Sequence, residues 1–186
     1  MLVRDATADD LGAIRTLYNA LIASTTVAWT EEPETHAARE SWFTERRARG
    51  DAVVVAEIDG AVVGYASYGP FRGEGRWPGY RHTVEHSIHV AEAHHGRGIG
   101  RKLMQALSDR AMADDIHVMV GAVDGDNQAS INFHERLGFE VVARMPQVGR
   151  KFDRWLDLVL MQRILDRDAS SGSRPSGAPS IRTTER

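Results

Sequence analysis

The stretch from Thr83 to Met104 contains the clearest change of hydrophobic period in the chain. Its first part alternates apolar with polar residues: Val84, Ile88 and Val90 with Glu85, Ser87 and His89. This is the two-residue period of a β-strand with chemically different faces. After a glycine-rich turn, apolar residues return at helical spacing: Ile99, Leu103, Ala106 and Leu107. The pattern predicts a strand with Glu85 on its polar face, a tight turn and an amphipathic helix.

The N-terminal half predicts five further elements by the same criteria. They are a strand at residues 2–4, a helix that begins at 7–10, a helix at 34–49, and strands at 52–58 and 61–68. Residues 24–33 break the helical period and are predicted to form a loop, and Asp59-Gly60 predicts a two-residue hairpin. In the second helix we expect Trp42 and Phe43 to face inward. The arginines should form a solvated outer face: Arg39, Arg46, Arg47 and Arg49.

The C-terminal half predicts a strand at 117–123, a short helix at 128–137, and strands at 140–143 and 155–161. Phe152 and Trp155 fall on the connection between the last two strands. Asn127 is suited to cap the short helix, and Gly138 to end it. We expect one domain over residues 1–165. The Ser-, Gly- and Pro-rich residues 166–186 are predicted to be a disordered tail.

Composition narrows the range of functions. The 186 residues are 42% apolar, which suits one well-buried α/β domain. A net charge of −3 with interspersed signs gives no basis for nucleic-acid binding, and no apolar run reaches the length of a membrane span. Without cysteine, thiolate catalysis and Cys-based zinc sites are excluded. The acidic start MLVRDATADD has no apolar targeting region, so we expect a cytoplasmic protein.

The turn after the strand contains Gly96, Gly98 and Gly100. A glycine-rich turn before a helix presents free backbone amides and the positive end of the helix dipole to an anion. The turn lacks the Lys-Ser/Thr of a P-loop and does not fit the dinucleotide pattern. Phosphate binding and a purely structural turn are therefore both compatible with the spacing alone.

The run from His95 to Gly100 resembles the acyl-CoA pyrophosphate loop of the GCN5-related N-acetyltransferases (GNAT), written Q/R-x-x-G-x-G/A. Three further stretches are similar to the phosphinothricin and methionine sulfoximine acetyltransferase branch: YRHTVEHSIHV, INFHERLGFE and MPQVGRKFDRWLDLVLMQ. The resemblance covers residues 1–165. It implies a single α/β domain whose mixed, mostly antiparallel sheet is flanked by helices, with two strands splayed apart for acyl-CoA. His95 replaces the customary Gln or Arg, but the loop acts mainly through main-chain amides, so we expect binding to survive.

The resemblance implies acetyl-CoA as cosubstrate and no metal. It places the cosubstrate against twelve residues: Ile88, His89, Val90, His95, Gly96, Arg97, Gly98, Ile99, Gly100, Arg101, Asn127 and Ser130. Asn127 is expected to bond the pantetheine arm in addition to capping its helix. A main-chain amide near Ile88 to Val90 would stabilise the developing oxyanion.

Glu85 is the candidate general base, because an amine attacks a thioester only when it is deprotonated. A carboxylate of ordinary pKa, about 4.3, is a weak base, so we expect partial burial or a water relay. The alternative is a structural Glu paired with an arginine. His134 stands where many relatives carry tyrosine, and its possible roles are base, acid toward the CoA thiolate, or structure.

Residues 71–81 form a loop rich in glycine, aromatic residues and arginine. A guanidinium can donate two parallel hydrogen bonds to the carboxylate of an amino acid, so Arg72, Arg76 and Tyr80 are candidate acceptor-binding residues. A solvated loop anchored by Trp77 and Tyr80 is the alternative. Four more residues complete the expected acceptor pocket: Trp29, Glu85, His86 and Ser87. Trp29 enters through the resemblance, and could instead pack against the helices.

Five histidines lie close together in the sequence: His82, His86, His89, His94 and His95. On a strand His82 and His86 share one face and His89 the other, and no cysteine or closely spaced carboxylate completes a tetrahedral set. We therefore predict no metal site.

These observations favour an acetyl-CoA-dependent N-acetyltransferase that acts on a small amino acid or an analogue. Phosphinothricin, methionine sulfoximine and methionine sulfone are the analogues implied by the resemblance, as is a role in resistance to such compounds. The absence of cysteine and of a G-x-S-x-G motif favours direct transfer in a ternary complex. The alternatives are acetylation of protein N-termini or lysines, and a non-catalytic acyl-CoA sensor. The resemblance also implies a homodimer.

Overall fold

The computed structural model describes residues 1–73 and 77–165, so the expectations for Arg76 and for the tail at 166–186 lie outside it. Seven strands of the described part form one sheet in the order β1-β2-β3-β4-β5-β7-β6. They are β1 (Leu2–Asp5), β2 (Val53–Ile58), β3 (Ala61–Pro70), β4 (Thr83–Val90), β5 (Val118–Asp124), β6 (Glu140–Lys151) and β7 (Arg154–Ile164). Only β4 and β5 pair in parallel, as expected of a mixed, mostly antiparallel sheet.

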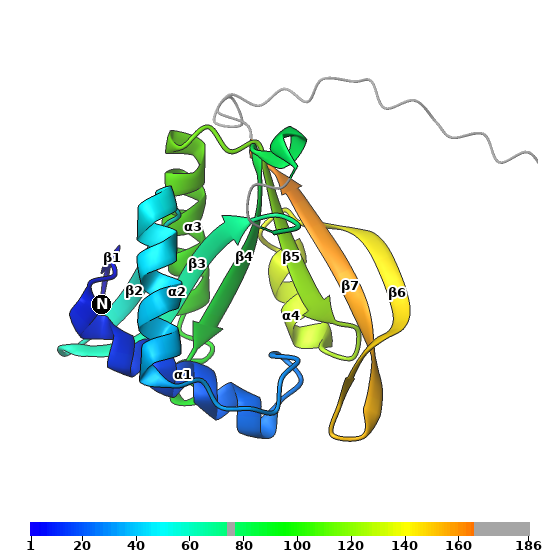
Figure 1. The fold of residues 1–186 in the computed structure, drawn as a ribbon, viewed down its shortest axis with the longest axis horizontal. Coiled ribbons are helices and arrows are strands. Elements are labelled where there is room, and N and C mark those ends of the chain that lie inside the picture. Colours follow the sequence, from blue (N-terminus) through cyan, green and yellow to red (C-terminus); the bar gives the residue numbers. More distant parts are fainter. Residues whose placement is uncertain (74–76, 166–186) are drawn as a thin grey trace, which may run out of the picture.

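Helices cover both faces of the sheet (Figure 1). We call the side covered by α1 (Leu11–Ser24) and α2 (His36–Arg49) the α2 face, and the side covered by α3 (Ile99–Ala113) and α4 (Gln128–Glu135) the α3 face. Each face has its own apolar core, centred on Tyr65 and Phe43 on the α2 face and on Leu103 and Met119 on the α3 face. In the described ranges, no helix combines the length and apolar character needed to cross a membrane.

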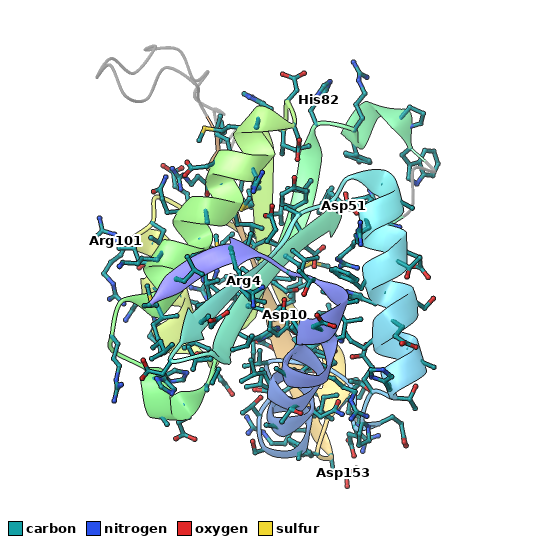
Figure 2. The ribbon with its side chains drawn as sticks, turned by 90° about the vertical axis from the view of Figure 1, so that its left-hand side faces the viewer. Arg4, Asp10, Asp51, His82, Arg101 and Asp153 are labelled. Carbon is teal, nitrogen blue, oxygen red and sulfur yellow. The ribbon has the colours of Figure 1, made fainter. Side chains whose placement is uncertain are left out.

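The first strand is tied to the start of α1 by Arg4. Its guanidinium contacts Asp10 at 2.7 Å and Glu57 at 2.8 Å, and Figure 2 shows Arg4 and Asp10 side by side. Asp10 also accepts the backbone amide of Thr7, which closes a capping turn where the helix was predicted to begin. The turn forms a short 3-10 segment, η1 (Ala8–Asp10), ahead of the helix.

Two hairpins of the sheet turn on two residues each. Asp59 and Gly60 have φ of 51° and 80°, which confirms the predicted hairpin. Phe152 and Asp153, at 51° and 55°, close a second hairpin between β6 and β7. The prediction that the strand at 140 ends at residue 143 was wrong. A bulge between Met145 and Gly149 accommodates Pro146, and the strand continues.

Lys151, at the end of β6, fastens the loop between α1 and α2. Its side chain is buried, and Nζ donates to the carbonyls of Ile22, Thr25 and Ala28 at 2.8, 2.7 and 2.7 Å. The amide of Phe152 also donates to Glu31 at 3.0 Å. The loop is thereby fixed between the end of α1 and the β6–β7 hairpin.

The prediction of a solvated arginine face on α2 was wrong for two of its four members. Arg39 is only 2% exposed, and its guanidinium pairs with Glu34 and lies 4.3 Å from the Trp42 ring centroid. Arg46, four residues after Trp42, is half-buried, and its Cζ lies 4.4 Å from the centroid of the same ring. The apolar stems and aromatic contacts of these arginines extend the α2-face core.

Candidate active site

The strands β4 and β5 separate part-way along their length. Their parallel pairing runs from Thr83 opposite Val118 to His86 opposite Gly121 and stops there. Beyond that point β4 continues through Ser87–Val90 and remains paired with β3 only. The main chain of Ser87–Val90 therefore has one free edge, which faces a gap between the strands and can pair with an extended ligand.

The glycine-rich turn lies at the end of this gap and leads into α3. Gly96 and Gly98 both have φ of 74°, a conformation that favours glycine, and a Cβ on either would meet open space. The first helical bond runs from the Lys102 amide to the Gly98 carbonyl at 3.2 Å. In the part of the chain that the structure describes, the amides of Ile99, Gly100 and Arg101 have no acceptor.

The side chains around the turn leave these amides accessible. Arg97 and Arg101 are exposed, and Figure 2 shows Arg101 projecting from α3. His95 bonds the Val90 carbonyl through Nε2 at 2.9 Å, which joins the turn to the end of β4. A Cβ on Gly100 would lie 3.2 Å from the Phe133 ring, so this glycine permits close packing of α3 on α4. The turn is thus built as an anion site at a helix N-terminus.

Glu85 lies on the α2 face, as the alternation predicted. Burial by the surrounding protein raises the pKa of this carboxyl, although the side chain still reaches solvent. Among residues 1–73 and 77–165, no cation lies within ion-pair distance of Glu85. The alternative of a structural Glu–Arg pair therefore has no support in the described residues, and the raised pKa suits a general base.

His89 is on the same face but is engaged with aromatic rings. Its ring centroid lies 5.0 Å from that of Tyr65 and 6.0 Å from that of Tyr18. Burial, assisted by the charge of Arg39, lowers the pKa of His89 to about 4. The imidazole is therefore neutral at physiological pH. The main chain of His89 pairs with Tyr65 of β3, so the main-chain groups that face the gap are those of its neighbours Ile88 and Val90.

His134 approaches the gap from the α3 face. Its Nδ1 lies 2.7 Å from the carbonyl of Ser130, and since a carbonyl only accepts, Nδ1 carries the proton. The Nε2 atom is then an unprotonated acceptor, buried and without a partner in the described part of the chain. Burial lowers the pKa of His134, which keeps the ring neutral. The Asn127 side chain accepts the Ser130 amide at 3.0 Å, which confirms its predicted capping role.

His86 does not join Glu85 and Ser87 in the acceptor pocket. Successive strand residues point to opposite faces, so His86 lies on the α3 face, with its ring centroid 5.1 Å from that of His134. Burial lowers its pKa to about 3. A Cβ on Gly121 would be 3.0 Å from His86 Nε2, so only glycine leaves room for this ring.

The residues predicted to bind the acceptor are dispersed. Arg72 and Tyr80 are exposed and contact each other, with Nη1 3.3 Å from the phenol oxygen. Trp29 packs over Gly149 of β6. The histidines are also separated: His82 precedes β4 and bonds the Asp115 carbonyl at 2.8 Å. The described residues contain no group of three potential metal ligands.

Sequence reasoning missed Arg46, whose guanidinium reaches the α2 face beside the cross-strand neighbour of Glu85. A signal was available. Arg39, Trp42 and Arg46 recur at spacings of three and four, which places them on one side of a helix.

A separating parallel strand pair, a helix N-terminus with free amides, and a carboxylate of raised pKa define the class of acyl-CoA-dependent N-acetyltransferases. The chain belongs to the acetyltransferase (GNAT) family, whose model matches residues 14–139.

Three relatives illustrate its similarity to known proteins. An L-methionine sulfoximine/L-methionine sulfone acetyltransferase of Pseudomonas aeruginosa (strain PAO1) is 48% identical over 88% of this chain and 94% of the relative. The structure of yncA of Salmonella typhimurium, with its cofactor acetyl-CoA, is 42% identical, covers 96% of this chain and 99% of that one, and has a TM-score of 0.85. A phosphinothricin acetyltransferase of Sinorhizobium meliloti in complex with acetyl-CoA is 33% identical, covers 96% and 95%, and has a TM-score of 0.84.

Proposed function

We propose that this protein transfers the acetyl group of acetyl-CoA to the α-amine of a small amino acid or analogue, such as methionine sulfoximine, methionine sulfone or phosphinothricin. The observation that carries the proposal is the gap between β4 and β5, with Glu85 beside it and the free amides of α3 at its end. The similarity to the Pseudomonas and Sinorhizobium enzymes supports this choice of acceptor.

The chain's own residues fit acetyl-CoA. The amides of residues 96–101 would hold the pyrophosphate, and the free edge of Ile88–Val90 would pair with the pantetheine arm, assisted by Asn127 and Ser130. When bound, acetyl-CoA supplies the activated acetyl group as a thioester. An amide of Ile88–Val90 is then placed to donate to the developing oxyanion.

Two residues on opposite sides of the gap would handle protons. Glu85 accepts a proton from the acceptor ammonium, directly or through water, and thereby frees the amine lone pair. Transfer breaks the carbon–sulfur bond and forms the amide, with no covalent intermediate on the enzyme. His134, neutral with a free Nε2, faces the side of the gap away from Glu85, where the sulfur departs. In this state it accepts a proton more readily than it donates one.

The wider setting is part of the same proposal. The protein acts in the cytoplasm as a homodimer, without metal, nucleic-acid or membrane partners, and acetylation of toxic amino-acid analogues gives it a resistance role. Exposed apolar side chains on the β6–β7 hairpin support self-association, among them Val142, Val148 and Trp155.

The test is a thiol-release assay with acetyl-CoA across amino acids, their sulfone and sulfoximine analogues, and a peptide with a free N-terminus. Turnover on free amino acids or analogues that is lost in Glu85→Gln is the expected result. Turnover on the peptide alone would favour protein N-terminal acetylation instead. Acetyl-CoA binding without turnover on any amine would identify a sensor and refute the proposal.

A further inference from the structure

The gap between β4 and β5 is closed at one end. The last pair of the parallel register is His86 opposite Gly121, and beyond it the two strands separate. The glycine-rich turn lies at the open end, where His95 joins it to the Val90 carbonyl. A cosubstrate held by the turn and paired with Ile88–Val90 points its acyl group toward the closed end. The side chains around His86 and Gly121 therefore determine how much room that group has.

Two imidazoles cover the α3 side of this closed end. The position of a Cβ on Gly121 lies 3.0 Å from Nε2 of His86 and 3.7 Å from both Nε2 and Cδ2 of His134. The two ring centroids are 5.1 Å apart, and each lies 5.3 Å from the Phe139 ring centroid. His86 and His134 are only 6% and 3% exposed. The rings thus extend from β4 and α4 over the same residue of β5, packed against each other.

The contribution of His86 at this position is steric. Both of its ring nitrogens are buried, and neither has a hydrogen-bond partner among residues 1–73 and 77–165. His134, by contrast, is anchored through Nδ1 to the Ser130 carbonyl. Burial lowers the pKa of His86 to about 3, so its ring is uncharged at neutral pH. An unpaired buried polar group does not stabilise a fold, so what His86 supplies is a ring of fixed volume.

The other directions around the acyl group are already occupied. Ahead of it, the main chains of His86 and Gly121 are joined in the sheet. On the α2 side lies Glu85, where the acceptor amine has to approach. A longer acyl chain could therefore extend only toward the α3 face, into the volume of the His86 ring. Because the ring is closely packed, it cannot yield without displacing its neighbours.

We propose that His86 restricts the acyl group to acetyl by closing the α3 side of the gap. The inference rests on the proposed function and adds a residue that determines which acyl-CoA the enzyme uses. Propionyl-CoA and butyryl-CoA, which carry one and two further methylenes, should be poor donors for the wild type.

The experiment measures kcat/KM for acetyl-, propionyl- and butyryl-CoA with methionine sulfone as acceptor. Calorimetry without acceptor gives the dissociation constant of each thioester. The wild type should prefer acetyl-CoA to propionyl-CoA by roughly 10- to 200-fold in kcat/KM, the usual discrimination by one methylene. His86→Ala should reduce this preference by about tenfold or more, and should bind the two longer thioesters more tightly than the wild type does.

Control variants separate space at the closed end from a general loosening of the core. Leu107→Ala opens a cavity in the same α3-face core, but on helix α3, and should keep the wild-type preference. His86→Phe retains a ring of similar size and should keep the preference as well. If His86→Ala does not fold, His86→Val removes less volume and suits a strand, and should shift the preference in the same direction by a smaller factor.

Three results would overturn the inference. The first is a wild type that uses propionyl-CoA as well as acetyl-CoA. The second is a folded His86→Ala that keeps the wild-type preference and dissociation constants. The third is an equal loss of preference in Leu107→Ala, which would assign the effect to core flexibility. A wild type that binds acetyl-CoA but acetylates no amine would instead refute the proposed function, and the dissociation constants would then decide the role of His86 by themselves.

Discussion

Glu85 and His134 approach the gap between β4 and β5 from opposite faces of the sheet. Two residues on one surface would compete for the same side of a bound thioester. Because the strands separate, a ligand between them is accessible from both sides. Glu85 can thus take the proton of the amine on one side, while the unprotonated Nε2 of His134 offers a second proton acceptor on the other.

Replacing Glu85 with Gln should lower kcat/KM for the amino acid by about 100-fold or more, the usual contribution of a general base. Stability at neutral pH should not fall. A carboxyl whose pKa is raised by folding stabilises the fold at low pH, and loses that contribution as the pH rises through the raised pKa. Gln keeps the neutral form at every pH. Glu135→Gln, on the exposed surface of α4, is the control for charge loss. A stable Glu85→Gln enzyme with nearly full rate would exclude the base role.

Replacing Gly98 with Ala should raise KM for acetyl-CoA, because the added Cβ strains the left-handed residue that directs the α3 amides outward. Gly60→Ala is a closely matched control. Gly60 has a φ of 80°, and a Cβ there also meets open space, but it lies in the β2–β3 hairpin. Both variants should lose about 1 kcal/mol of unfolding free energy in denaturant titrations. Equal KM values for acetyl-CoA in the two variants would count against the anion site.

Much of this arrangement was predictable from the sequence because it depends on local rules. The alternation around Glu85 fixed its face, and Asp59-Gly60 fixed a turn, since both follow from backbone geometry. The sequence did not reveal that Arg39 and Arg46 turn inward. Helical spacing shows which residues share a side, but only the sheet and Trp42 make that side favourable for a guanidinium.

His86 and β6 were mispredicted for related reasons. The alternation already places His86 on the face opposite Glu85, but the room that His134 and Gly121 leave for its ring depends on residues distant in sequence. The full length of β6 was hidden by Pro146, since a proline usually ends a strand unless a bulge absorbs it. In both cases the deciding contacts are between residues far apart in the chain.

Replacing Lys151 with Met should destabilise the protein by about 3–5 kcal/mol, because two buried carbonyls and a part-buried one lose their donor. Denaturant unfolding would measure the loss, and hydrogen exchange should show faster opening of residues 22–28. Lys102→Met, at an exposed position of α3, removes the same charge without a buried network. Equal stability of the two variants would show that the loop is held by other contacts.

The unfolding free energy should decrease as the pH falls from about 6.5, the ordinary histidine pKa, toward the value of about 4 to which folding lowers the pKa of His89. As the pH falls, the unfolded chain binds a proton on this histidine at a higher pH than the folded chain does. The stabilisation that the group contributes above pH 6.5, on the order of 3 kcal/mol, is therefore lost over that interval. His89→Gln should show a shallower decline than the wild type, and the exposed His117→Gln should not. Parallel curves for all three proteins would contradict the neutral, buried state of His89.

Because β4 and β5 pair over only half of their length, the sheet is incomplete when no ligand lies between them. An extended cosubstrate that fills the opening acts as a missing strand, so its binding free energy is added to the folding free energy. The enzyme is then most resistant to unfolding and proteolysis when acetyl-CoA is abundant. We therefore expect the unfolding free energy of the protein to rise with the concentration of acetyl-CoA.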